Sequence, residues 1–109
     1  MTHPSIVQPS EHARYSPDKM SKATIFESPR LLVGLNAFEP GQQHALHAHA
    51  GQDKVYYVLE GRGRFLLEGR ELEMTAGDLL VAPEGVPHGV HNTGPGRLLV
   101  LAVLAPGPR

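Results

Sequence analysis

Two histidines separated by one residue, His47 and His49, are the part of this sequence best suited to chemistry. Side chains of a β-strand alternate between its faces, so both imidazoles would project from one side and could converge on a metal ion or ligand. A helix would separate them, because helical neighbours lie three or four positions apart. A turn at Pro40–Gly41 and a segment of strand-forming residues at 55–59 favour the strand. The alternative is an exposed pair of histidines without a function.

The size and composition of the chain exclude several classes of protein. A chain of 109 residues forms one small domain, and its net charge of −1 offers no basic stripe for nucleic acid or anionic membranes. Because there is no cysteine, any metal must be held by imidazole and oxygen ligands. The absence of disulfides and of an apolar leader predicts a cytoplasmic location. The longest apolar run, 98–105, is too short to cross a bilayer.

Frequent turn residues predict an all-β protein. Twelve glycines and ten prolines divide this short chain into roughly eight to ten short antiparallel strands, and no stretch has the period of a core helix. Residues 1–22 lack a sustained period, and we expect an N-terminal arm there that is partly disordered or packed on the body. Residues 23–106 form the predicted barrel domain. Gly34, inside an apolar strand, indicates a bulge or a close backbone approach.

Two segments resemble the conserved motifs of the cupin family. The first motif, G-x5-H-x-H-x(3,4)-E-x6-G, is matched by Gly41, His47, His49 and Gly61. The second, G-x5-P-x-G-x2-H-x3-N, is matched at every defined position by Gly77, Pro83, Gly85, His88 and Asn92. Fifteen residues separate the motifs, a spacing typical of small single-domain bacterial cupins of type 2. The resemblance implies a jelly-roll β-barrel (a double-stranded β-helix), usually a homodimer, with a divalent metal in its mouth held by three histidines and one glutamate.

One position departs from the family pattern. Six residues separate Lys54 from Gly61, so Lys54 stands where the glutamate ligand belongs, and Asp53 precedes it. On a regular strand Asp53 faces away from Lys54, so it cannot replace the glutamate without a bulge. Lys54 shares its face with Tyr56, on the side that we assign to the interior. A charged ammonium has no lone pair, so it cannot ligate a cation and would repel one.

This departure leaves two kinds of site open. In the first, His47, His49 and His88 hold Fe, Mn, Ni, Cu or Zn as three neutral imidazoles, with water or substrate at the open positions. Gln43, expected on the same strand face, then offers an oxygen ligand or a hydrogen bond. In the second, no metal binds tightly, and Lys54 with the histidines receives a carboxylate-bearing molecule or transfers a proton.

Other side chains in these motifs receive structural assignments. His44 and His91 are expected on the faces opposite His47 and His88, and therefore on the outer surface. Asn92 is expected to fix the turn after its strand. Tyr56 is assigned to core packing, with contact to a substrate as the alternative.

Three functions follow. The leading one is a metal-binding cupin that acts on, or binds, a small organic acid or chelatable ketone, as a dioxygenase, isomerase or lyase. The second is a non-catalytic sensor that binds a small molecule without a tightly bound metal. The third is an interaction role, with dimerisation through the apolar strands at 31–38 and 98–104.

Overall fold

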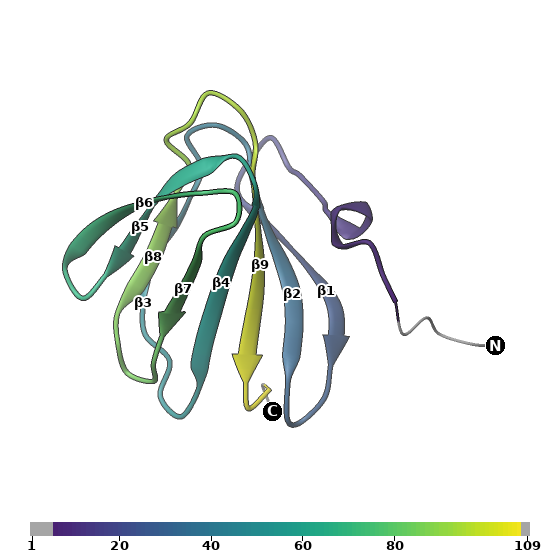
Figure 1. Ribbon diagram of the computed structural model, residues 1–109, viewed down its shortest axis with the longest axis vertical. Coiled ribbons are helices and arrows are strands. Elements are labelled where there is room, and N and C mark those ends of the chain that lie inside the picture. Colours follow the sequence, from purple (N-terminus) through teal and green to yellow (C-terminus); the bar gives the residue numbers. More distant parts are fainter. Residues whose placement is uncertain (1–5, 108–109) are drawn as a thin grey trace.

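The structure, a computed structural model, describes residues 6–107 and forms nine strands in two sheets that face each other (Figure 1). One short 3-10 helix, η1 (Pro9–His12), precedes them. The strands are β1 (Ser21–Glu27), β2 (Leu32–Phe38), β3 (Gln43–His47), β4 (Asp53–Glu60), β5 (Arg62–Leu67), β6 (Arg70–Thr75), β7 (Leu79–Ala82), β8 (His88–His91) and β9 (Leu98–Ala105).

The order of the strands shows how distant parts of the chain come together. One sheet has the order β1-β2-β9-β4-β7 and the other the order β3-β8-β5-β6, and all pairings are antiparallel. β9, the last strand, lies between β2 and β4, while β8 lies between β3 and β5 (Figure 1). This arrangement confirms the predicted all-β jelly roll. It also places β3 beside β8, the two strands that carry His47 and His88.

The space between the sheets holds the main core. Along β4 every second residue is buried, so that Lys54, Tyr56 and Val58 point inward, as predicted, while Asp53 is exposed. Ring packing of Tyr56 on Phe65, with centroids 5.6 Å apart, joins the two sheets. The buried members of this core are Phe38, Tyr56, Val58, Phe65, Met74, Leu80, Ala82, Val90, Leu98, Val100 and Ala102.

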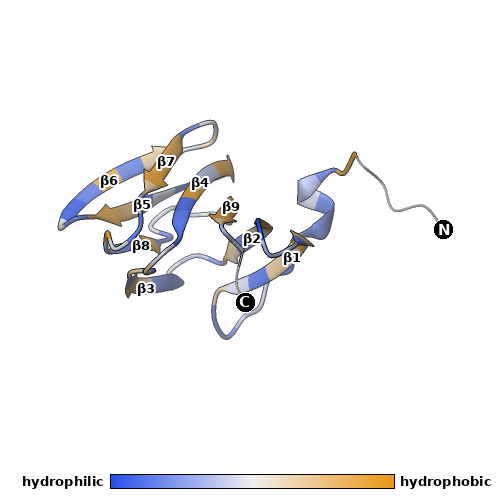
Figure 2. Ribbon diagram, turned by 90° about the horizontal axis from the view of Figure 1, so that it is seen from below, coloured by the Kyte–Doolittle hydropathy of each residue, from blue (hydrophilic) through white to orange (hydrophobic). Residues whose placement is uncertain are grey.

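The outward face of the five-stranded sheet is also apolar. Strand register places two rows of side chains across β2, β9, β4 and β7. One row consists of Val33, Val103, Val55 and Val81, and the other of Leu35, Leu101, Tyr57 and Leu79. Leu35 is buried, whereas Leu79 and Val81 at the β7 edge are 59% and 50% exposed. Orange segments mark hydrophobic residues on β4, β7 and β9 (Figure 2).

The N-terminal arm is packed against the body over part of its length. Tyr15 packs on the cluster around Leu35, and its ring lies 4.2 Å from the guanidinium of Arg97. Arg97 donates two hydrogen bonds to Glu39, each 3.1 Å long. The first strand begins at Ser21, before the predicted boundary at 23, because the backbone at 21–22 already pairs with β2. Residues 1–5 of the arm lie outside the described residues.

Gly34 makes the close backbone approach that its position predicts. A Cβ at Gly34 would lie 2.9 Å from the carbonyl oxygen of Ala23 on β1, and the register of β1 shifts between Thr24 and Phe26. In the described part of the chain, no helix is long and apolar enough to cross a bilayer.

Candidate metal site

His47 and His88 face each other across the pairing of β3 with β8. The two residues are register partners, and their ring centroids are 4.3 Å apart. The Nδ1 of each ring lies at hydrogen-bond distance from a carbonyl two residues earlier, 2.7 Å from Ala45 for His47 and 2.9 Å from Val86 for His88. If Nδ1 carries the proton and donates it to the carbonyl, Nε2 keeps its lone pair and is free to bind a metal.

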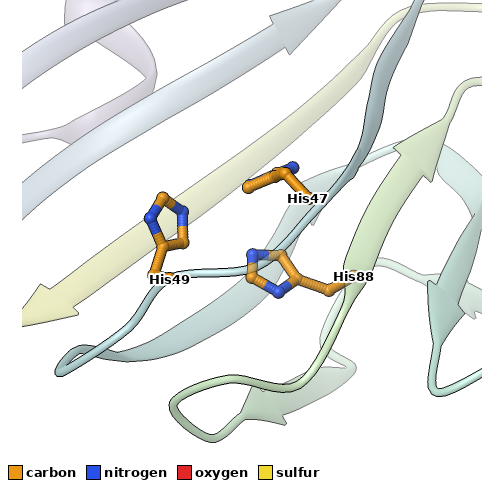
Figure 3. Close-up of side chains that lie close together, drawn as sticks. All are labelled: His47, His49 and His88. Atoms are coloured by element: carbon orange, nitrogen blue, oxygen red, sulfur yellow. The ribbon is translucent and has the colours of Figure 1, made fainter.

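His49 completes the group from just beyond the end of β3 (Figure 3). Its ring centroid lies 4.9 Å from that of His47 and 5.4 Å from that of His88. One nitrogen from each of these rings lies within 4.8 Å of the others. The predicted convergence of the three imidazoles is therefore found, although β3 ends at His47 and the loop positions His49.

The loop that carries His49 is tied to the loop that delivers His88. The carbonyl of His49 accepts a hydrogen bond of 2.8 Å from the N–H of Gly85, which adopts a φ of 76°. The Glu84 carboxylate accepts a bond of 2.8 Å from the N–H of Gly51. Asp53, which faces away from the histidines, accepts a bond of 3.0 Å from the N–H of Glu84. Asp53 therefore holds the loop and does not replace the missing glutamate.

The chemistry of the three rings fits a divalent metal. The Nε2 atoms of His47, His49 and His88 are buried, and none has a hydrogen-bond partner. Burial lowers the pKa of all three imidazoles, that of His88 to about 4. Neutral rings with free, inward-facing nitrogens are the form that coordinates Fe, Mn, Ni, Cu or Zn.

His44 is the residue that sequence reasoning misplaced. The prediction that it faces outward is wrong, because β3 shifts register between His44 and His47 and turns His44 toward the other rings. Its ring centroid lies 4.2 Å from that of His47, its Nδ1 is buried without a partner, and burial lowers its pKa to about 3. The same shift leaves Gln43 exposed, so the expectation that Gln43 shares the face of His47 is also wrong. Neither glycine nor proline marks this bulge in the sequence.

Lys54 occupies the interior position that the family pattern gives to glutamate. It is 5% exposed, and its Nζ lies 4.8 Å from the centre of the Tyr56 ring. Burial, with a smaller contribution from the charge of Lys22, lowers its pKa to about 8. At neutral pH Lys54 therefore remains mostly protonated and brings a positive charge to the cavity that His49 also lines.

Tyr56 and Asn36 add polar groups to the interior. Tyr56 is fully buried, its ring centroid lies 5.9 Å from that of His88, and its hydroxyl has no partner. Burial raises its pKa, so the hydroxyl stays protonated. Asn36 is 4% exposed, and its Nδ2 also lacks a partner. Sequence reasoning missed Asn36, although a single amide in an apolar strand was a signal for it.

Two assignments from the second motif are confirmed. His91 lies outside the group of three histidines and follows the buried Val90 on β8. Asn92 is buried and holds the turn that follows β8. Its amide donates to the carbonyls of Phe38 and Gly96, at 3.1 and 2.9 Å, and its Oδ1 accepts from the N–H of Gly94 at 3.0 Å.

Comparisons with known proteins agree with this geometry. Residues 34–104 match the family model described as the cupin domain. An oxalate-binding protein from Thermotoga maritima is 34% identical over 85 residues, which cover 78% of this chain and 69% of that protein. The crystal structure of TT1209 from Thermus thermophilus superposes with a TM-score of 0.92 at 42% identity, covering 96% of this chain and 100% of the other.

A third similar protein is the crystal structure of a predicted oxalate decarboxylase from Thermotoga maritima. It has a TM-score of 0.79 and 27% identity, and the match covers 92% of this chain and 97% of that one. The family match spans both histidine motifs and the strands that position them. On this match and on its jelly-roll fold, the chain belongs to the cupin family.

Proposed function

We propose that this cupin holds one divalent metal ion at His47, His49 and His88 and that it binds, or acts on, a small organic acid beside that ion. The observation that carries the proposal is that the Nε2 atoms of these three rings are buried and have no hydrogen-bond partner. One nitrogen from each ring lies within 4.8 Å of the others. Leaving such nitrogens unpaired in the interior is costly unless a ligand satisfies them. Iron, manganese, nickel, copper and zinc are the candidate ions.

The metal would supply Lewis acidity toward a carboxylate or carbonyl oxygen. The protein's own residues would orient the acid: Lys54 carries the charge that attracts an anion, and the buried Tyr56 hydroxyl is a free donor. The names of two similar proteins, an oxalate-binding protein and a predicted oxalate decarboxylase, support a small carboxylic acid as the ligand. If the protein is an enzyme, we infer a metal-dependent lyase, dioxygenase or isomerase.

The metal is tested by elemental analysis of protein that has been loaded with each candidate ion and then desalted. We expect about one ion per wild-type chain and loss of that ion in His49→Ala. His91→Ala is the matched control, because His91 lies outside the group of three, and it should retain the ion. A wild-type chain that retains none of the ions contradicts the proposal.

A second candidate function is favoured by Lys54. A buried ammonium in the position of a metal-ligating glutamate weakens cation binding, which suits a sensor that binds an organic anion without metal or turnover. This candidate predicts that small carboxylates raise the melting temperature of metal-free protein. Conversion of any of these acids to a product would exclude it.

We also propose that the protein forms a homodimer through the outward face of the five-stranded sheet. The two apolar rows on this face continue to the exposed Leu79 and Val81, and a second copy would supply matching apolar rows.

A further inference from the structure

A small cavity lies beside the candidate metal site, on the inner face of the five-stranded sheet. It has a volume of about 160 Å³, below the roughly 300 Å³ at which pockets for drug-sized ligands begin. His49 and Lys54 both line it, together with Lys22 and Asn36. The lining contains no aspartate or glutamate, so the cavity offers positive charge and an amide without a compensating carboxylate.

Two of these polar side chains, Lys54 and Asn36, are buried, and the ammonium of Lys54 contacts the face of the Tyr56 ring. Lys54 is 5% exposed, and in the described part of the chain no carboxylate oxygen lies within 4 Å of its ammonium. Asn36 is 4% exposed, and its Nδ2 donates to no acceptor. Buried donors are almost always paired in folded proteins, and a buried cation needs an anion. An anionic acceptor inside the cavity would pair with both the Lys54 ammonium and the Asn36 amide.

The strand register explains why there is space for that anion. Lys22 on β1 is the register partner of Asn36 on β2, so both side chains project from the same face. Between Asn36 and Lys54 on β4, the inner face carries Ala102 of β9, whose partner on β2 is Gly34. These two small residues leave the space between the amide and the ammonium open. His49 borders this space and thus connects it to the three imidazoles.

We propose that this cavity binds one carboxylate of a short dicarboxylate, with Lys54 and Asn36 as the specificity-determining residues, while the other carboxylate reaches the metal at the three histidines. The inference rests on the proposed function for its metal-bound end. It specifies the ligand as a dicarboxylate, because a monocarboxylate would occupy only one of the two subsites, the cavity or the metal. Lys54 acts here through the ligand and does not coordinate the metal.

The test is calorimetric titration of nickel-loaded protein with oxalate, malonate, succinate and acetate. We expect at least one of the three dicarboxylates to bind the wild type at least tenfold more tightly than acetate does. Lys54→Met removes the charge and retains the apolar chain, and Asn36→Asp places a carboxylate in the cavity. Each variant should weaken dicarboxylate binding at least tenfold and acetate binding less than threefold. Lys19→Met, an exposed lysine that does not line the cavity, is the matched control and should bind as the wild type.

Metal content, measured on each variant before titration, separates this inference from the proposed function. We expect Lys54→Met and Asn36→Asp to retain at least as much nickel as the wild type. Equal losses for acetate and dicarboxylates, or unchanged dicarboxylate binding in both variants, would overturn the inference. If the wild type holds no metal, the proposed function fails, and succinate binding to metal-free protein then decides the cavity alone. If metal-free wild type binds succinate and Lys54→Met does not, the anion subsite is supported. If metal-free wild type does not bind succinate, the anion subsite is overturned.

Discussion

His47 and His88 are direct register partners on β3 and β8, and the Nδ1 of each lies within 2.9 Å of a carbonyl two residues before it in the chain. The same local arrangement on two strands leaves the Nε2 atom of each ring buried without a hydrogen-bond partner. The ring of His44 packs beside that of His47, but His44 does not belong to the group of three. Mutation of His44 and of His88 can therefore distinguish a histidine that only lies near the site from one that binds the metal.

We expect His88→Ala to weaken metal binding by about 100-fold or more, because it removes one of three ligands. His44→Ala should weaken it by less than about tenfold, because His44 touches a ligand but provides none. A chromophoric chelator in competition with the protein measures both affinities. Equal losses in the two variants would show that His44 ligates the ion and that the group of three is wrongly defined.

Replacing the positive charge at position 54 should increase the affinity for a metal ion. Lys54→Glu replaces an inward-facing cation with a carboxylate at the family's ligand position, and we expect at least about tenfold tighter binding of a divalent ion. Lys54→Met, which only removes the repulsion, should give a smaller gain. The same chelator competition ranks the variants, and a glutamate no better than methionine would mean that residue 54 does not reach the ion.

Acidification should destabilise the metal-free protein. The folded-state pKa values of His44 and His88, about 3 and about 4, lie below the ordinary value of 6.5, so the unfolded chain binds more protons below pH 6.5. Stability is thus fully present above pH 6.5 and is lost as the pH falls, by up to about 2 kcal/mol at pH 5 for the buried His88. Urea unfolding at pH 7.5 and pH 5 measures this loss.

The control for this pH dependence is a histidine outside the site. His88→Asn should make the stability profile less steep, because it removes one of the two imidazoles and leaves His44, whereas His12→Asn in the arm should leave the profile unchanged. A wild-type profile that is flat between pH 7.5 and pH 5 would contradict neutral, desolvated imidazoles.

Asn92 should be the most costly polar residue of the turn to replace. Asn92→Ala removes two donated bonds and one accepted bond in a buried position, and we expect about 3 kcal/mol less stability. Chemical denaturation gives the difference, with Gln43→Ala at an exposed position as the control. A loss below about 0.5 kcal/mol would remove Asn92 from the determinants of the fold.

The homodimer is tested at the centre of the outward face. Val103 lies between Val33 and Val55 in the valine row, and Val103→Lys would place a charge there. We expect the wild type to have twice the mass of one chain by light scattering and the variant to have the mass of one chain. Lys22→Glu, on the opposite face of the sheet, should stay dimeric, and a monomeric wild type would refute the proposed interface.

Alternation and turn residues were sufficient to predict much of this molecule. The inward set of Lys54, Tyr56 and Val58 follows from the period of a strand, and the position of Asn92 in its motif predicted the turn that its amide holds. His44 could not be placed in this way, because the register shift in β3 depends on pairing with β8, which lies more than forty residues away in the sequence. The amide of Asn36 is visible in its apolar strand, but its lack of a partner emerges only when β1, β2, β9 and β4 are assembled.

The hydrogen bond from Gly85 to the carbonyl of His49 couples two motifs that are separate in the sequence. It ties the β3–β4 connection to the β7–β8 connection, so the spacing between the rings of His49 and His88 is set by the backbone as well as by side-chain rotation. Lengthening either connection would therefore change the position of both rings, even though only one of them is carried by the altered loop.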